Sequence, residues 1–157
     1  MSPCHFNVPS FENMKQTVQE KFGLSPCTWQ LQAAQYQLNS KDVIMISPTG
    51  SRKTLTFWIP LIFNAGGIII IVTPLNILGE KNQKEAEALG FPAINLCKET
   101  ASDQAFKDIE KLKYCIIMVS PERLLSDSHF QALWKSKKFT ETRFQTFRAS
   151  LCIFTVS

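Results

Sequence analysis

The stretch that most constrains the fold runs from Ser47 to Thr54 and reads Ser-Pro-Thr-Gly-Ser-Arg-Lys-Thr. An apolar run precedes it, so the pattern predicts a buried strand over 42–47, then a tight turn, then a helix opened by Lys53 and Thr54. A phosphate-binding loop is built in this way, because backbone N–H groups and a helix N-terminus then face the phosphates. The lysine of such a loop reaches the β- and γ-phosphate oxygens, and the threonine holds Mg²⁺. One residue departs from the pattern, because Arg52 stands where a glycine is expected.

The composition is that of a globular domain with a core, since 45% of the 157 residues are hydrophobic. Seventeen Lys and Arg against thirteen Asp and Glu give a net charge of +4, which is compatible with a polyanionic partner without requiring one. The five cysteines are scattered, with no Cys-x-x-Cys pair, and we interpret them as reduced thiols of an intracellular protein. The first ten residues carry no signal-peptide pattern.

Helical and strand patterns alternate along the chain. Spacings of three and four between apolar residues, with glycine and proline breaks, predict helices over 11–22, 29–38, 54–64, 75–89, 102–112 and 127–134, and a helical turn opened by 120–122. Continuous apolar runs predict further strands over 68–72, 93–96, 114–119 and 151–156. This alternation predicts an α/β fold, with a parallel sheet that has helices on both faces.

Ligands of such sheets bind beyond the carboxyl ends of the strands. The turns after three predicted strands, Ser47–Lys53, Thr73–Leu75 and Ser120–Arg123, are therefore expected on one edge. The second and third turns place a hydroxyl and a helix N-terminus where they can bind a nucleic-acid phosphate without reading bases. Taken singly, Thr73 and Ser120 are better explained as ordinary helix caps.

Taken together, these pieces resemble the first RecA-like domain of a superfamily 2 helicase of the DEAD/DEAH type, most closely the RecQ-like DNA helicases. Gln30 stands at the spacing of the family's Q motif, and Ser47–Thr54 matches motif I. Val72–Leu78 looks like motif Ia, and Val119–Leu125 looks like the "PERL" segment that follows it. The resemblance implies an incomplete RecA-like P-loop domain over 26–157, after a helical lead-in over 1–25.

The resemblance also implies ATP and Mg²⁺ as cofactors and single-stranded or forked DNA as partner. In the family the Q-motif glutamine reads the adenine edge. The implied nucleotide-binding residues are Gln30, Thr49, Gly50, Ser51, Arg52, Lys53 and Thr54, with Thr54 also on Mg²⁺. The implied nucleic-acid-binding residues are Thr73, Pro74, Leu75, Ser120, Pro121, Glu122 and Arg123.

Two departures limit what the resemblance implies. Glycine adopts backbone angles that other residues avoid, so Arg52 is expected to weaken ATP binding, although its charge can itself attract phosphate. In the family, a strand like 151–156 leads into Asp-Glu-Ala-His, whose acidic pair holds Mg²⁺ and positions the attacking water; here Ser157 follows Val156. We therefore expect no catalytic residue and negligible ATP hydrolysis from these 157 residues. They are interpreted as an N-terminal fragment or a degenerate copy of an ATP-dependent 3′–5′ DNA helicase.

Alternatives from other classes remain open at this point. The same sheet edge suits a non-catalytic module that binds nucleic acid or a protein. Residues 55–79 carry no charge, but Pro60, Asn64 and Pro74 interrupt them, which disfavours a membrane span. The basic, aromatic stretch 135–148 is better explained as a solvated linker than as a nucleic-acid contact. The expected location is intracellular, and nuclear in a eukaryote.

Overall fold

The computed structural model describes residues 8–48, 50–64, 67–74, 76–137, 139 and 152–153. They form two compact units, one up to Phe63 and the other from Asn64 onward.

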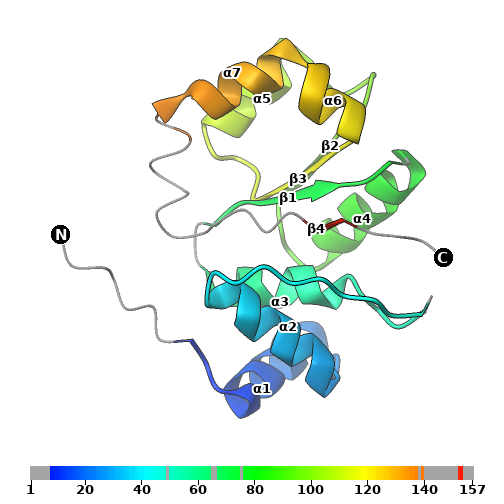
Figure 1. Cartoon of the computed structure of the whole chain (residues 1–157), viewed down its shortest axis with the longest axis vertical. Coiled ribbons are helices and arrows are strands. Elements are labelled where there is room, and N and C mark those ends of the chain that lie inside the picture. Colours follow the sequence, from blue (N-terminus) through cyan, green and yellow to red (C-terminus); the bar gives the residue numbers. More distant parts are fainter. Residues whose placement is uncertain are drawn as a thin grey trace. The chain divides into compact units, whose positions relative to one another are not determined.

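The first unit consists of helices and an extended segment (Figure 1). Its helices are α1 (Phe11–Phe22), α2 (Thr28–Leu38) and α3 (Leu55–Phe63). Helix α1 buries Met14 and Val18 completely and ends at Gly23, whose φ of 65° is the left-handed conformation of a glycine C-cap. The helices predicted over 11–22 and 29–38 are confirmed to within one residue, because apolar spacing and glycine stops are local signals.

The strand predicted over 42–47 is wrong. Residues 41–48 form neither helix nor strand, and the side chains of Ile44 and Ile46 are 95% and 92% exposed. The alternate residues Val43 and Met45 are half-buried and line an open groove beside α2. The residue types favour extended backbone, but a strand exists only where a neighbouring chain pairs with its N–H and C=O groups. Within the described residues, no strand pairs with this segment.

The second unit contains a parallel sheet with the strand order β2-β3-β1-β4. In chain order its elements are β1 (Ile69–Val72), α4 (Asn76–Ala88), β2 (Ala93–Leu96), α5 (Asp103–Glu110), β3 (Ile116–Val119), α6 (Pro121–Ser126), α7 (Ser128–Lys135) and β4 (Cys152–Ile153). Strand β3 is paired with β1 from Ile69↔Ile116 to Val72↔Val119, and with β2 from Ala93↔Ile116 to Leu96↔Val119. Strand β4 pairs with β1. The predicted α/β fold with a parallel sheet is confirmed.

Helices cover both faces of this sheet, as Figure 1 shows for α4 on one side and α5 and α7 on the other. Alternate strand residues such as Ile70, Leu96 and Ile117 form one core cluster with the buried side chains of α5 and α7, which are Ala105, Phe106, Ile109, Phe130 and Leu133. On the opposite face α4 packs against β2 and β3. The predicted arrangement of helices is thus confirmed for this unit.

Part of the stretch predicted as a linker belongs to the core. Phe139 is 1% exposed, and its ring meets the ring of Trp134 edge to face, with a centroid distance of 6.4 Å. Residues 138 and 140–148 lie outside the described residues. The remaining residues of the predicted fourth strand, 151 and 154–156, also lie outside them.

The uncharged stretch 55–79 divides into α3, β1 and the start of α4. No helix in the described part of the chain has the length and apolar character needed to cross a membrane.

Candidate nucleotide-binding loop and nucleic-acid edge

The loop after residues 41–46 is closed by its own hydroxyl groups. Ser51 Oγ lies 2.8 Å from the carbonyl oxygen of Pro48, to which it donates, and the hydroxyls of Ser47 and Ser51 are hydrogen-bonded to each other. Gly50 has a φ of 82°, which a glycine adopts without steric cost. Thr49 lies outside the described residues. The predicted tight turn is therefore present, although the strand predicted before it is absent.

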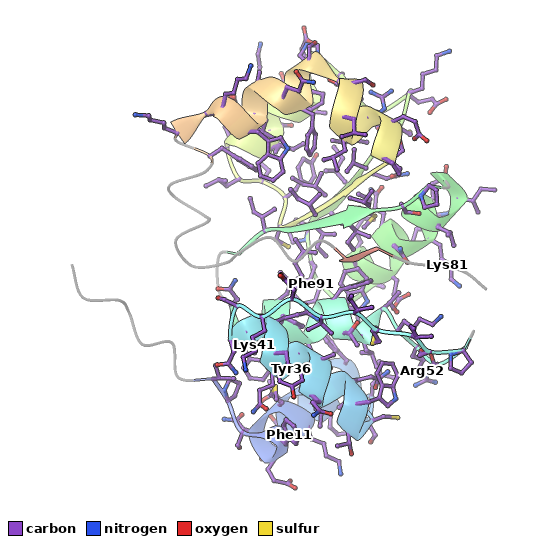
Figure 2. The ribbon with its side chains drawn as sticks, viewed as in Figure 1. Phe11, Tyr36, Lys41, Arg52, Lys81 and Phe91 are labelled. Carbon is purple, nitrogen blue, oxygen red and sulfur yellow. The ribbon has the colours of Figure 1, made fainter. Side chains whose placement is uncertain are left out.

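Arg52 occupies the position where the pattern expects glycine, and it adopts a left-handed backbone with a φ of 52°. The left-handed conformation costs a residue with a side chain roughly 1–2 kcal/mol. The Arg52 side chain is exposed (Figure 2). The loop thus has the backbone angle that a glycine would supply, and the weaker ATP binding expected from Arg52 stays a prediction.

Lys53 and Thr54 lie directly before α3 and are half-buried. The first turn of the helix is formed by Thr56 N donating to Lys53 O at 3.0 Å and by Phe57 N donating to Thr54 O at 2.9 Å. The Lys53 ammonium forms no ion pair with any residue that the structure describes. A cation at the N-terminus of a nine-residue helix is suited to a bound anion.

Gln30 is the residue that ties α2 to this loop. Its side chain is 2% exposed, and its Nε2 donates to the carbonyl oxygens of Ser51 at 3.2 Å and Arg52 at 3.0 Å. Its Oε1 accepts from the backbone N–H of Cys27 at 2.8 Å. The structure therefore brings Gln30 and the loop together across 21 residues of sequence. The Gln30 amide thus donates to backbone carbonyls of the loop. The sequence does not reveal this role.

A magnesium ion at this loop would depend on the nucleotide for most of its ligands. Among the described residues, no three His, Cys, Asp or Glu side chains gather into a metal site. Mg²⁺ commonly keeps several waters and is held by one or two protein oxygens together with substrate phosphates. The Thr54 hydroxyl fits that pattern as a single protein ligand, and Mg²⁺ would supply charge neutralisation of the phosphates there.

The second candidate site lies at the carboxyl edge of the sheet. Thr73 follows β1 and Ser120 follows β3, and the pairing Val72↔Val119 makes these two residues neighbours. The backbone N–H of Thr73 donates to the Val119 carbonyl at 3.0 Å. The expectation of a shared edge is confirmed for these two turns. The phosphate loop belongs to the other unit, and its place at this edge stays a prediction.

Ser120 caps helix α6, as expected for this residue when it is considered singly. Its Oγ accepts from the backbone N–H of Arg123 at 3.3 Å, and Pro121 occupies the first turn of α6. Glu122 is exposed, and its own backbone N–H and then the Ser120 hydroxyl lower the pKa of its carboxyl. Arg123 Nη1 lies 2.8 Å from Asp127 Oδ2, so its charge is already balanced by a carboxylate. Of the other residues predicted here, Pro74 is exposed, Thr73 is 4% exposed, and Leu75 lies outside the described residues.

A third turn reaches the same edge and was missed from the sequence. Because Leu96 pairs with Val119, the residues after β2 lie beside Ser120. Thr100 Oγ1 accepts from the Cys97 backbone N–H at 2.9 Å and donates to the Asn95 carbonyl, which closes this turn. A hydrogen bond from the Cys97 thiol is the main reason why the pKa of Glu99 is lowered, and Arg123 contributes to the same shift. The predicted strand over 93–96 could have revealed this turn, because the carboxyl ends of parallel strands lie at the same edge of a sheet.

The sequence profile of the DEAD/DEAH box helicases matches residues 27–148, which is most of the chain. The chain belongs to the DEAD/DEAH box helicase family. This match covers α2, the phosphate loop and the sheet-edge turns, so both candidate sites lie within the helicase domain.

Similar curated proteins include helicases of both DNA and RNA. The chain is 27% identical over 115 residues to the ATP-dependent DNA helicase hus2/rqh1 of Schizosaccharomyces pombe, a match of 68% of this chain and 9% of that protein. It is 34% identical over 116 residues to the ATP-dependent RNA helicase CHR1 of Candida albicans, covering 65% of this chain and 20% of that protein. It is 30% identical over 104 residues to the ATP-dependent DNA helicase RecQ of Haemophilus influenzae, covering 64% and 16%. The chain thus spans a fifth or less of the length of these relatives.

Proposed function

We propose that this helicase-family chain binds ATP with Mg²⁺ through the loop Ser47–Thr54 and binds single-stranded or forked DNA along the carboxyl edge of the sheet. The proposal places the chain within a RecQ-like helicase that couples ATP hydrolysis to 3′–5′ unwinding. The observation that carries it is the arrangement of Gln30, the loop and Lys53 before α3, inside a region that matches the family. The nuclear location expected in a eukaryote is part of the same proposal.

The nucleotide half of the proposal rests on electrostatics. The carbonyls of Ser51 and Arg52 accept hydrogen bonds from the amide of Gln30. The Arg52 side chain is exposed, and the Lys53 side chain is half-buried. Two adjacent cations at a helix N-terminus attract the triphosphate of ATP. Thr54 follows as the hydroxyl ligand of the Mg²⁺ that accompanies those phosphates.

The nucleic-acid half rests on three turns that end at one edge. Thr73, Ser120 and the Cys97–Thr100 turn each lie at the end of a strand of one parallel sheet. Backbone N–H groups and hydroxyls at such positions contact phosphates without reading bases. The names of two of the three relatives above support DNA as the nucleic acid.

The nucleotide site is tested by titrating ATP·Mg²⁺ into the chain and into its Lys53→Ala variant. Loss of the ammonium at the loop should weaken binding at least tenfold. Lys21→Ala is the matched control, because Lys21 is an exposed lysine in the last turn of α1. Equal affinities of the wild type and Lys53→Ala would show that the loop is not a nucleotide site.

A non-catalytic binding module is the second candidate function, and the pairing of Arg123 with Asp127 favours it. An arginine already matched with a carboxylate contributes less to phosphate binding, so the edge also suits a polar protein surface. DNA binding that persists without ATP and falls steeply with salt would support a nucleic-acid module. No DNA binding at low salt would favour a protein partner.

A further inference from the structure

Pro60 interrupts the hydrogen bonds of α3 close to the phosphate loop. It lies inside the helix and is buried. In an α-helix the carbonyl of each residue accepts from the N–H four residues later, and proline has no N–H. The carbonyl affected is that of Thr56, four residues before Pro60, which is 0% exposed. A buried carbonyl that loses its usual donor needs another one.

Gln37 of α2 supplies a donor to this carbonyl. Its Nε2 lies 3.2 Å from the carbonyl oxygen of Thr56, and the residue is 6% exposed. The Oε1 atom of the same amide is buried and has no hydrogen-bond partner among the residues that the structure describes. A buried amide with only one end paired is unfavourable beside an apolar side chain of the same shape. The contact with Thr56 therefore accounts for a glutamine at this buried position.

Thr56 continues this connection to the loop lysine. Its Oγ1 donates to the carbonyl oxygen of Lys53 at 2.7 Å, and its backbone N–H donates to the same oxygen at 3.0 Å. One residue thus joins the carbonyl left by Pro60 to the peptide group of Lys53. The hydrogen bonds run from Gln37 through Thr56 to Lys53, all within the first unit.

We propose that Gln37 is a positioning residue for the nucleotide phosphates. By replacing the N–H that Pro60 lacks, it holds the first turn of α3, and with it the Lys53 ammonium and the Thr54 hydroxyl, in the place that the triphosphate requires. Gln37 acts through the backbone of α3 and not by touching the nucleotide. This inference rests on the proposed nucleotide site.

A double-mutant cycle tests the proposal by titration of ATP·Mg²⁺ into the full chain. Gln37→Met keeps an unbranched side chain and removes the amide donor, whereas Pro60→Ala restores the N–H inside α3. Gln37→Met should weaken binding by about threefold to tenfold when Pro60 is present, and by less than about twofold in the Pro60→Ala background. Gln32→Met is the matched control with unchanged affinity, because Gln32 is exposed on the same helix.

The outcomes separate this inference from the proposed nucleotide site. If Lys53→Ala weakens ATP binding and Gln37→Met does not, the positioning role is wrong and the nucleotide site stands. An equal loss from Gln37→Met in both backgrounds would show that the N–H missing at Pro60 is not the reason for the glutamine, which also overturns the proposal. Equal affinities of the wild type and Lys53→Ala would overturn the nucleotide site and the positioning role together.

NMR of the ligand-free chain distinguishes positioning from a general loss of stability. The backbone amide signals of Lys53 and Thr54 should shift in Gln37→Met, while the urea midpoint shows that the variant remains folded under the conditions of the titration. In the double variant with Pro60→Ala these signals should keep the positions that they have in Pro60→Ala alone. Signals of Lys53 and Thr54 that do not respond to Gln37→Met would overturn the proposal without reference to any nucleotide.

Discussion

The Nε2 atom of Gln30 lies 3.0 Å from the carbonyl oxygen of Arg52, and the hydrogen bond joins α2 to a residue whose φ is 52°. The left-handed conformation is unfavourable for arginine by itself. The loop therefore combines an unfavourable local angle with a partly buried hydrogen bond to the same residue. The two residues are far apart in sequence and act as one structural unit.

Replacing Arg52 with glycine should stabilise the chain slightly. Glycine removes a steric cost of roughly 1–2 kcal/mol from the folded state. Its greater conformational freedom in the unfolded chain lowers the stability by about 0.5–1 kcal/mol. The free energy of unfolding, measured by urea denaturation, should rise by about 0–1.5 kcal/mol. Arg52→Ala is the control, because alanine keeps the Cβ that disfavours this angle. If alanine stabilises the chain as much as glycine does, the backbone angle is not the cause.

The packing of α4 on β2 depends on the absence of a side chain at Gly79. A Cβ placed there would lie 2.4 Å from Asn95 Oδ1 and 2.7 Å from its Cγ. Gly79→Ala should lower the free energy of unfolding by about 1–3 kcal/mol, because crowding in a close-packed contact exceeds the helix propensity that alanine adds. Thermal or urea unfolding measures the change.

Lys84→Ala serves as the control for Gly79→Ala, since Lys84 is exposed on the same helix. The double variant Gly79→Ala with Asn95→Ala removes the obstructing amide. It should recover part of the loss attributed to the clash, when compared with Asn95→Ala alone. A Gly79→Ala variant as stable as the wild type would refute the close approach of α4 and β2.

Much of the fold follows from local sequence signals. The helix over 11–22 and the strands around 69–72, 93–96 and 116–119 are formed by apolar spacings and runs that need no distant partner to be recognised. The failure at 42–47 has the opposite cause, because a run of strand-forming residues does not specify which chain pairs with it.

The candidate site shows the same division. Gly50 and the Lys53-Thr54 pair are recognisable one residue at a time, because each has a local role in a phosphate loop. The double contact of Gln30 could not be predicted, because its partners are backbone carbonyls 21 and 22 residues away. The balance of Arg123 by Asp127 depends likewise on the turn between α6 and α7.

The ion pair between Lys113 and Asp108 predicts a pH dependence at the end of α5. Lys113 Nζ lies 2.7 Å from Asp108 Oδ1; a hydrogen bond with the ammonium lowers the pKa of Asp108, and the same bond raises the pKa of Lys113. The lowered carboxyl pKa gives stability that is present above its unfolded value, about 3.9, and is lost as the pH falls through the folded value. The raised lysine pKa gives stability that is present below about 10.4 and is lost as the pH rises through the folded value.

Asp108→Asn should therefore destabilise the chain at pH 7, and its effect should shrink as the pH falls through the folded-state pKa of Asp108, because the wild-type carboxyl then becomes as neutral as the amide. The difference in urea midpoint between variant and wild type measures this at each pH. A carbon-detected NMR titration of Asp108 should show its pKa rising toward the ordinary value in Lys113→Gln. An Asp108 pKa that does not respond to Lys113→Gln would contradict the ion pair.

Ser120 offers a way to separate its role as a cap from a role in phosphate binding. Its Oγ accepts from the Arg123 N–H at 3.3 Å, so Ser120→Ala should cost about 1 kcal/mol of stability, as loss of a helix N-cap commonly does. Ser120→Asp keeps an N-cap acceptor and adds a negative charge beside Thr73.

The aspartate variant should fold as stably as the wild type, yet bind single-stranded DNA at least threefold more weakly, because the new charge repels a phosphate at this edge. Ser102→Asp is the matched control, since Ser102 caps α5 in the same manner. Fluorescence anisotropy with a labelled oligonucleotide measures the affinity, and equal binding by Ser120→Asp and the wild type would place the DNA elsewhere on the chain.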